Sequence, residues 1–151
     1  MKYITGFIIF IFFCINCFAA EEYDKTNEID IVASTIYHEC RGESYEGKMA
    51  VASVIYNRSR QERWKNLGLS GVCLQKYQFS CHNNGYNEAL PTNTLDRISL
   101  KECRSIAASM VNGWFTPIID SNHYCAIWCD VDWKHQLRNV VIIGNHIFGT
   151  L

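Results

Sequence analysis

The residues best suited to chemistry lie in the segment HECRGESYEGKMAVASVIYNR, residues 38–58. Its Glu39 follows a mostly apolar stretch and precedes a turn marked by Gly42. Partial burial disfavours the charged form of a carboxyl and raises its pKa, and such an acid can protonate a glycosidic oxygen near neutral pH. Spacing alone also fits a solvated charge at a helix end, or a partner of Arg41.

The flanking sequence predicts the helices that position this segment. Apolar residues recur with helical spacing over Ile29–Tyr37, and the helix is predicted to end near Cys40. A second helix is predicted over Tyr45–Trp64, followed by a loop at Gly68 and Gly71.

Farther along the chain, residues 78–94 are polar and aperiodic, which predicts an irregular segment. A third helix is predicted to begin at Ser99, where Glu102 would complete a capping box, and to end at Gly113. Short strands are predicted over His123–Trp128 and Asn139–Ile143, the second taken as buried. The pattern indicates an α+β domain, mainly helical with a small C-terminal β element.

The N-terminus has the pattern of a secretory signal peptide, which we assign to residues 1–20. Lys2 precedes an apolar stretch over Tyr3–Phe18, and small residues at Ala19 and Ala20 offer a cleavage site. A retained membrane anchor is the alternative. We therefore expect a secreted, periplasmic or cell-wall protein that contacts the membrane only through this segment. Without an internal linker or repeat, residues 21–151 are predicted to form one domain.

Six cysteines follow the signal segment. An even number behind an export signal predicts disulfides, although six cysteines can pair in fifteen ways and the sequence does not choose among them. A zinc site at His123, Cys125 and Cys129 is the competing interpretation, but no second ligand pair occurs at a suitable spacing. We expect neither a metal nor a cofactor. The cysteines are Cys40, Cys73, Cys81, Cys103, Cys125 and Cys129.

The formal net charge of the chain is −1, and no block of basic residues occurs in it. Nucleic acid binding by charge is therefore not expected. We expect the protein to act as a monomer.

Several separated motifs resemble the cell wall hydrolase family typified by spore cortex-lytic enzymes (SleB/CwlJ type). The chain has Glu39-Cys40-Arg41-Gly42-Glu43, then Glu46-Gly47, the run Ala50–Arg58 and Gln78-Phe79-Ser80. Near the C-terminus it has His123-Tyr124, Trp133 and the run Ile143–Phe148. The resemblance covers roughly residues 28–148. The chain departs from the family in its cysteine content.

The resemblance implies a lysozyme-like fold with Glu39 as the catalytic glutamate, and peptidoglycan glycan strands as substrate. It implies cleavage between N-acetylmuramic acid and N-acetylglucosamine as a lytic transglycosylase, with one acid. Muramidase-type hydrolysis needs a second carboxylate, for which the sequence offers Glu43, Glu46, Asp130 and Asp132.

A glycan-binding module and a zinc amidase are the alternatives to a glycan-cleaving enzyme. A non-catalytic glycan-binding module would be expected to lack Glu39. A zinc amidase of the HExxH type lacks its second histidine here, because Gly42 stands four residues after His38.

The family motifs also imply residues that bind the glycan. An amide, histidine rings and aromatic side chains can all hold a sugar, although each also fits a structural role. Gly144 predicts close backbone approach beside two of them. The predicted substrate-binding residues are Gln78, His123, Tyr124, Trp133, Asn145 and His146.

Overall fold

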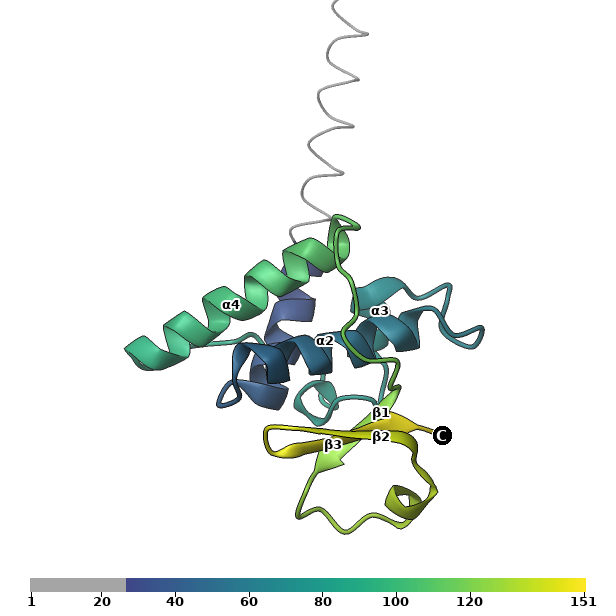
Figure 1. Ribbon diagram of the computed structural model, residues 1–151. Helices are drawn as coiled ribbons and strands as arrows, with labels where there is room; N and C mark the ends of the chain where they lie inside the picture. The colour runs from purple at the N-terminus through teal and green to yellow at the C-terminus, as the bar shows by residue number, and fades with distance from the viewer. Residues whose placement is uncertain (1–26) are drawn as a thin grey trace, which may run out of the picture.

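The computed structural model describes residues 27–151 (Figure 1). The predicted signal segment, residues 1–20, lies outside the described residues. The helical elements are a first helix over residues 27–40, α2 (Tyr45–Ser59), α3 (Gly68–Leu74) and α4 (Thr94–Val111), with short 3-10 turns η1 (Ser80–His82) and η2 (Asp132–Gln136). The strands are β1 (His123–Ala126), β2 (Arg138–Ile143) and β3 (His146–Thr150).

The helices gather at one end of the molecule and the small sheet lies at the other (Figure 1). The core is centred on the first helix and α2, where Val32, Ile36, Val54 and Ile55 are fully buried. The predicted α+β arrangement, mainly helical with a C-terminal β element, is confirmed. Within residues 27–151, every helix is too short or too polar to span a bilayer.

Helix α2 ends at Ser59, five residues before the predicted end at Trp64. The Ser59 hydroxyl donates to the carbonyl of Tyr56 at 2.7 Å, and the chain continues through turns instead. These turns carry Trp64 into the core, where it is 8% exposed. Burial of the indole therefore decides where this helix stops.

The predicted loop at Gly68 and Gly71 is wrong, because this stretch forms α3. Val72 and Cys73 are fully buried on its inner side. Its first turn is capped by a residue that is distant in sequence, since the Glu28 carboxylate accepts from the backbone N–H of Ser70 at 3.2 Å. Burial and this remote cap outweigh the low helix propensity of glycine.

Helix α4 begins at Thr94, five residues before the predicted start at Ser99. Asn93 is the N-cap residue, and its side chain accepts from the N–H of Asp96 at 2.9 Å. The Ser99 hydroxyl instead donates to the Arg41 carbonyl at 2.8 Å, which fixes α4 to the end of the first helix. Gly113, at φ +80°, follows the helix as predicted.

The sheet is antiparallel with strand order β1-β3-β2. Its central strand, β3, was not predicted, and β1 is shorter than predicted. The prediction that Asn139–Ile143 is buried is also wrong. Strand β2 lies at one edge of the sheet, and its Val140 and Ile142 are 48% and 61% exposed. The sheet packs on the helical core through the fully buried Phe148 of β3, together with Tyr124 of β1 and Ile143 of β2.

Candidate active site

Glu39 lies in the last turn of the first helix, half-buried, with its carboxyl at a cleft of about 530 Å³ between the helices and the sheet. The cleft brings together residues from distant parts of the chain. Five of the six predicted substrate-binding residues line it beside Glu39, namely Gln78, His123, Tyr124, Trp133 and His146.

The Glu39 carboxylate accepts a hydrogen bond from a neighbouring side chain. The Tyr124 hydroxyl donates to its Oε2 at 2.7 Å. Burial, followed by the nearby Glu39 charge, raises the pKa of the Cys81 thiol to about 12. Burial, followed by the Glu39 charge, raises the pKa of Tyr124 well above its usual value. Tyr124 therefore stays neutral and keeps its proton for Glu39.

Arg58 supplies positive charge to the floor of the cleft. It is 7% exposed, its Nε donates to the Asn122 carbonyl at 2.8 Å, and its guanidinium lies 5.2 Å from the Phe79 ring centroid. Its Nη1 is buried without a hydrogen-bond partner within residues 27–151. Burial lowers the pKa of Arg58, and nearby acidic groups, Glu39 among them, counteract part of this shift. The guanidinium is therefore placed to stabilise the ionised form of Glu39.

The sheet and η2 form the opposite wall. The rings of His123 and Trp133 lie with centroids 5.6 Å apart, and His123 Nδ1 is 2.7 Å from the Asn122 side-chain oxygen. Burial, then the nearby Arg58 and Arg63, lowers the pKa of His123. His123 is therefore neutral at neutral pH, and its ring with that of Trp133 offers a surface on which a sugar can lie.

His146 reaches the cleft from β3, with its ring centroid 5.6 Å from that of Tyr124. The largely buried Glu43 side chain holds the turn at Gly144 and Asn145, just before His146, in place. Glu43 accepts from Asn145 Nδ2 at 3.0 Å and lies 3.5 Å from His146 Nδ1. A Cβ at Gly144 would overlap Glu43 Oε2. The predicted close approach at Gly144 is confirmed, and its partner is this carboxylate.

Asn145 is the one predicted substrate-binding residue that the structure does not bring into the cleft. Its side chain is bound to Glu43, and its carbonyl accepts from the N–H of Ile127 at 2.9 Å. Both contacts hold the tip of the β2–β3 hairpin in place. Asn145 therefore shapes the wall of the site from behind.

The other carboxylates considered from the sequence do not line the cleft. Glu43 is occupied by the hairpin, Glu46 borders a separate apolar groove, and Asp130 and Asp132 are exposed. Among residues 27–151, Glu39 is the only carboxylate in the lining. In the same described range, no three histidine, cysteine or acidic side chains lie close enough to hold a metal ion.

Sequence reasoning did not place six residues of the lining in the site, which are Arg58, Tyr77, Ser80, Cys125, Ala126 and Cys129. Arg58 lies in the same family motif as Glu39, which was an available signal. Tyr77 and Ser80 flank Gln78, and Tyr77 has φ +67°, which no sequence pattern indicates.

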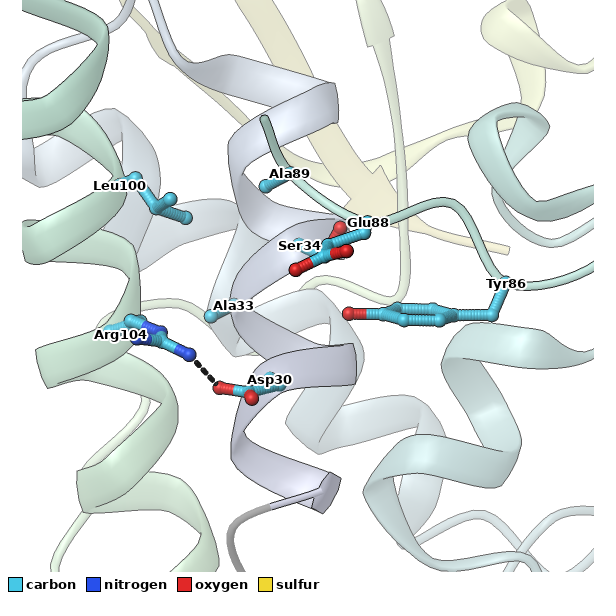
Figure 2. A pocket seen from close by; sticks show the side chains of 8 residues that line it. All are labelled: Asp30, Ala33, Ser34, Tyr86, Glu88, Ala89, Leu100 and Arg104. Carbon is cyan, nitrogen blue, oxygen red and sulfur yellow. Dashed lines mark hydrogen bonds and ion pairs between the residues drawn. The ribbon is translucent and has the colours of Figure 1, made fainter. Parts of the chain in front are cut away.

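A second, smaller hollow of about 130 Å³ lies between the first helix and α4 (Figure 2). Arg104 and Asp30 form an ion pair at one end of it, and the Tyr86 hydroxyl points toward its centre. None of the predicted site residues lines this hollow. The chemistry predicted from the sequence therefore belongs to the cleft at Glu39.

The sequence model of one family, described as Cell Wall Hydrolase, matches residues 42–149. The chain belongs to the Cell Wall Hydrolase family. The predicted relationship to SleB/CwlJ-type members of this family is confirmed. The family match begins three residues after Glu39.

Two curated members of the family show how much is shared. The spore cortex-lytic enzyme of Bacillus subtilis (strain 168) is 28% identical over 129 residues, covering 82% of this chain and 38% of that protein. The spore cortex-lytic enzyme of Halalkalibacterium halodurans is 35% identical over 123 residues, covering 81% and 34%. The chain thus spans less than half the length of these relatives.

Two solved structures of this Cell Wall Hydrolase type share the fold. The catalytic domain of the Bacillus cereus SleB protein matches with a TM-score of 0.59 and 28% identity, covering 82% of this chain and 90% of that one. The catalytic domain of a germination-specific lytic transglycosylase, SleB from Bacillus anthracis, matches with a TM-score of 0.60 and 28% identity, covering 82% and 93%. The predicted lysozyme-like fold is confirmed.

Proposed function

We propose that this protein cleaves the glycan strands of peptidoglycan between N-acetylmuramic acid and N-acetylglucosamine, as a lytic transglycosylase with Glu39 as its acid catalyst. The observation that carries the proposal is the single carboxylate in the cleft, fixed by the hydroxyl of Tyr124 at 2.7 Å. Membership of the Cell Wall Hydrolase family supports it, as does the likeness to a structure named a lytic transglycosylase.

A single acid is sufficient for this reaction. Protonated Glu39 gives its proton to the glycosidic oxygen while the bond from that oxygen to the anomeric carbon breaks. The C6 hydroxyl of the same muramic acid then attacks the anomeric carbon, and ionised Glu39 takes the proton of that hydroxyl. The products are a new N-acetylglucosamine hydroxyl and a 1,6-anhydro end, and Glu39 returns to its starting form.

The surroundings of Glu39 suit a group that alternates between acid and base. The Tyr124 hydroxyl donates to the Glu39 carboxylate, and the buried Arg58 guanidinium lies in the same lining, so both can stabilise the negative charge that Glu39 carries in mid-reaction. Hydrolysis by a water-activating base needs a second carboxylate at about 5–10 Å. The absence of such a group from the described lining of the cleft favours the internal hydroxyl as nucleophile.

The remaining cleft residues are proposed to bind the glycan. Trp133 and His123 offer a tilted aromatic surface for a sugar ring, and Gln78 offers an amide that can donate to and accept from an acetamido group. His146 lies beside Tyr124, where it can touch the sugar next to the scissile bond. We place Asn145 outside this set, as a residue that holds the hairpin.

We propose that the chain is exported and acts as a single catalytic domain over residues 21–151, reaching the cell wall by means of residues 1–20. Peptidoglycan lies outside the cytoplasmic membrane, so an export segment and this substrate are consistent with each other. The six cysteines after residue 20 also fit an oxidising compartment.

Digestion of purified peptidoglycan with the wild type and with Glu39→Gln tests the proposal, with mass analysis of the fragments. We expect muropeptides with 1,6-anhydro ends from the wild type and none from the variant. Reducing muramic acid ends would overturn the transglycosylase mechanism while keeping the cleavage site. Free stem peptides would overturn the glycosidic assignment altogether.

A further inference from the structure

All six cysteines of the described chain carry free thiols in the structure, and their surroundings point to three pairs that the sequence left unassigned. The first pair is Cys40 and Cys103, both buried in the helical core. The hydrogen bond from the Ser99 hydroxyl to the Arg41 carbonyl joins α4 to the residue after Cys40. Because Cys103 lies one helical turn after Ser99, it shares the face of α4 that meets Cys40.

The second pair is Cys73, in the last turn of α3, and Cys81, in η1. Both pack in the helical core, where Cys73 is fully buried and Cys81 partly so. His82, the residue after Cys81, places its Nε2 2.9 Å from the buried Thr35 hydroxyl. The loop between the two cysteines folds back on itself, since Tyr77 donates its N–H to the Asn83 side chain at 3.0 Å.

The third pair is Cys125 and Cys129, at the end of β1. A tight turn reverses the chain between them, in which the N–H of Cys129 donates to the carbonyl of Ala126 at 2.9 Å. Both cysteines line the cleft that contains Glu39. The turn therefore brings Cys129 back to the position of Cys125, on the same wall of the cleft.

Charge interactions point to the same three pairs. A thiolate at Cys103 raises the pKa of Cys40, one at Cys81 raises that of Cys73, and one at Cys129 raises that of Cys125. No cysteine of another pair occurs among the causes of any of these shifts. Charge interactions weaken with distance, so these shifts support the pairing that the packing suggests.

We propose that the exported protein carries three disulfides, Cys40–Cys103, Cys73–Cys81 and Cys125–Cys129. In each, two thiols lose two protons and two electrons as the sulfur–sulfur bond forms. A small disulfide such as oxidised glutathione accepts them and leaves as two thiols. The Cys40–Cys103 bridge, which closes the longest loop and is called the long bridge below, ties the first helix to α4. The Cys73–Cys81 bridge braces the loop after α3, and the Cys125–Cys129 bridge braces the wall of the cleft.

The buried pairs must close while the chain folds. The thiolate is the attacking species, and burial raises the pKa of Cys73, Cys81 and Cys103 to about 12, so few thiolates exist in the folded protein at neutral pH. The three bridges leave the donor to the Glu39 carboxylate, the Tyr124 hydroxyl, in place.

Peptide mapping of the full chain tests the pairing directly. The unfolded, reduced chain is refolded in a mixture of oxidised and reduced glutathione, free thiols are alkylated, and the digest is analysed by mass spectrometry without reduction. Trypsin cuts after Lys76, between the second pair, and chymotrypsin after Trp128, between the third. Three linked peptides of the stated composition are expected. Six alkylated thiols in the folded protein, or a different majority pairing (links to Cys14 or Cys17 included), would overturn the proposal.

Thermal unfolding gives a second, independent readout for the long bridge. In the oxidised protein, Cys40→Ser alone should lower the Tm by about 10 °C, and the double variant with Cys103→Ser should lower it no further, because either change breaks the same bond. Cys125→Ser with Cys129→Ser is the matched control, with a smaller loss because its loop is short. Independent, additive losses from Cys40→Ser and Cys103→Ser would contradict the bridge. Should these variants fail to fold, the wild-type map still decides the pairing.

Discussion

The helical region and the C-terminal sheet contribute to the cleft in different ways. The first helix and α2 are almost completely buried at their centre, and this packing fixes Glu39 at the end of a rigid element. The sheet supplies His123, Tyr124 and His146, yet its edge strand β2 is largely exposed. The acid is therefore positioned by apolar packing, whereas its partners belong to a region with little core of its own.

Polar contacts join the two regions across the cleft. Tyr124 bonds Glu39 at 2.7 Å, and Glu43, four residues further along, bonds Asn145 in the hairpin at 3.0 Å. Arg58 on α2 bonds the Asn122 carbonyl just before β1 at 2.8 Å. Apolar packing should thus govern stability, and these contacts should govern activity. Four measurements can separate the two contributions.

The largest change in stability is expected from the helical core. Ile36→Ala removes a fully buried side chain, and it should lower the free energy of unfolding by about 2–5 kcal/mol. Ile142→Ala on β2 is the control, because a side chain that is 61% exposed should cost less than about 1 kcal/mol. Denaturant unfolding measures both. Equal losses at the two sites would remove the distinction between the regions.

The next effect concerns catalysis. Tyr124→Phe removes the donor to Glu39 Oε2 and keeps the ring packed on Phe148, so kcat should fall about tenfold or more while the Tm changes little. Tyr45→Phe, at an exposed residue outside the cleft, should leave kcat unchanged. Steady-state rates of glycan release distinguish the two. An unchanged kcat in Tyr124→Phe would mean that this bond does not support the acid.

A smaller effect is expected at the hairpin contact. Glu43→Gln replaces one acceptor oxygen with an amide group that faces the donors of Asn145, which should cost about 1 kcal/mol and lower kcat several-fold by loosening His146. Glu46→Gln is the matched control in the next turn of the chain. If Glu43→Gln reduced activity as much as loss of Glu39, then Glu43 would be a catalytic group and the one-acid mechanism would be wrong.

The smallest effect is a dependence of stability on pH. His82 is buried, its Nδ1 accepts from the N–H of Asn87 at 3.1 Å, and burial lowers its pKa. The unfolded chain therefore binds the proton first, so stability is complete above about pH 6.5 and declines as the pH falls below that value. His82→Gln should flatten the fall in Tm between pH 7 and pH 5, whereas His135→Gln at an exposed site should leave it intact. An equal slope in His82→Gln and the wild type would contradict this account.

The sequence predicted the first helix, the acid at its end and most of the cleft lining, because these follow from local apolar spacing and from contiguous family motifs. It missed α3, where it predicted a loop, and it misplaced the start of α4. The first turn of α3 is capped by Glu28, which is distant in sequence. The first turn of α4 is capped by Asn93, whereas the sequence analysis took Ser99 as the cap. Local patterns cannot show a cap that arrives from another element.

The sequence also missed β3, although a signal was present. Gly144 and Asn145 form a two-residue turn between paired strands, and a Gly-Asn dipeptide between apolar runs is a known hairpin pattern. The exposure of β2 also escaped the sequence analysis, because a Val-Val-Ile-Ile run is apolar whether or not another element covers it. The role of Asn145 behind the wall depended on Glu43, about a hundred residues earlier, and so lay beyond any local pattern.

The central claim is that one carboxyl, Glu39, carries out the cleavage. The most direct test is the initial rate of glycan release from purified peptidoglycan by Glu39→Gln, compared at equal folded concentration with the wild type and with Glu46→Gln. A loss of at least about a hundredfold in Glu39→Gln, with wild-type rates in Glu46→Gln, is the predicted result. A Glu39→Gln protein that folds normally and still releases glycan at the wild-type rate would contradict it.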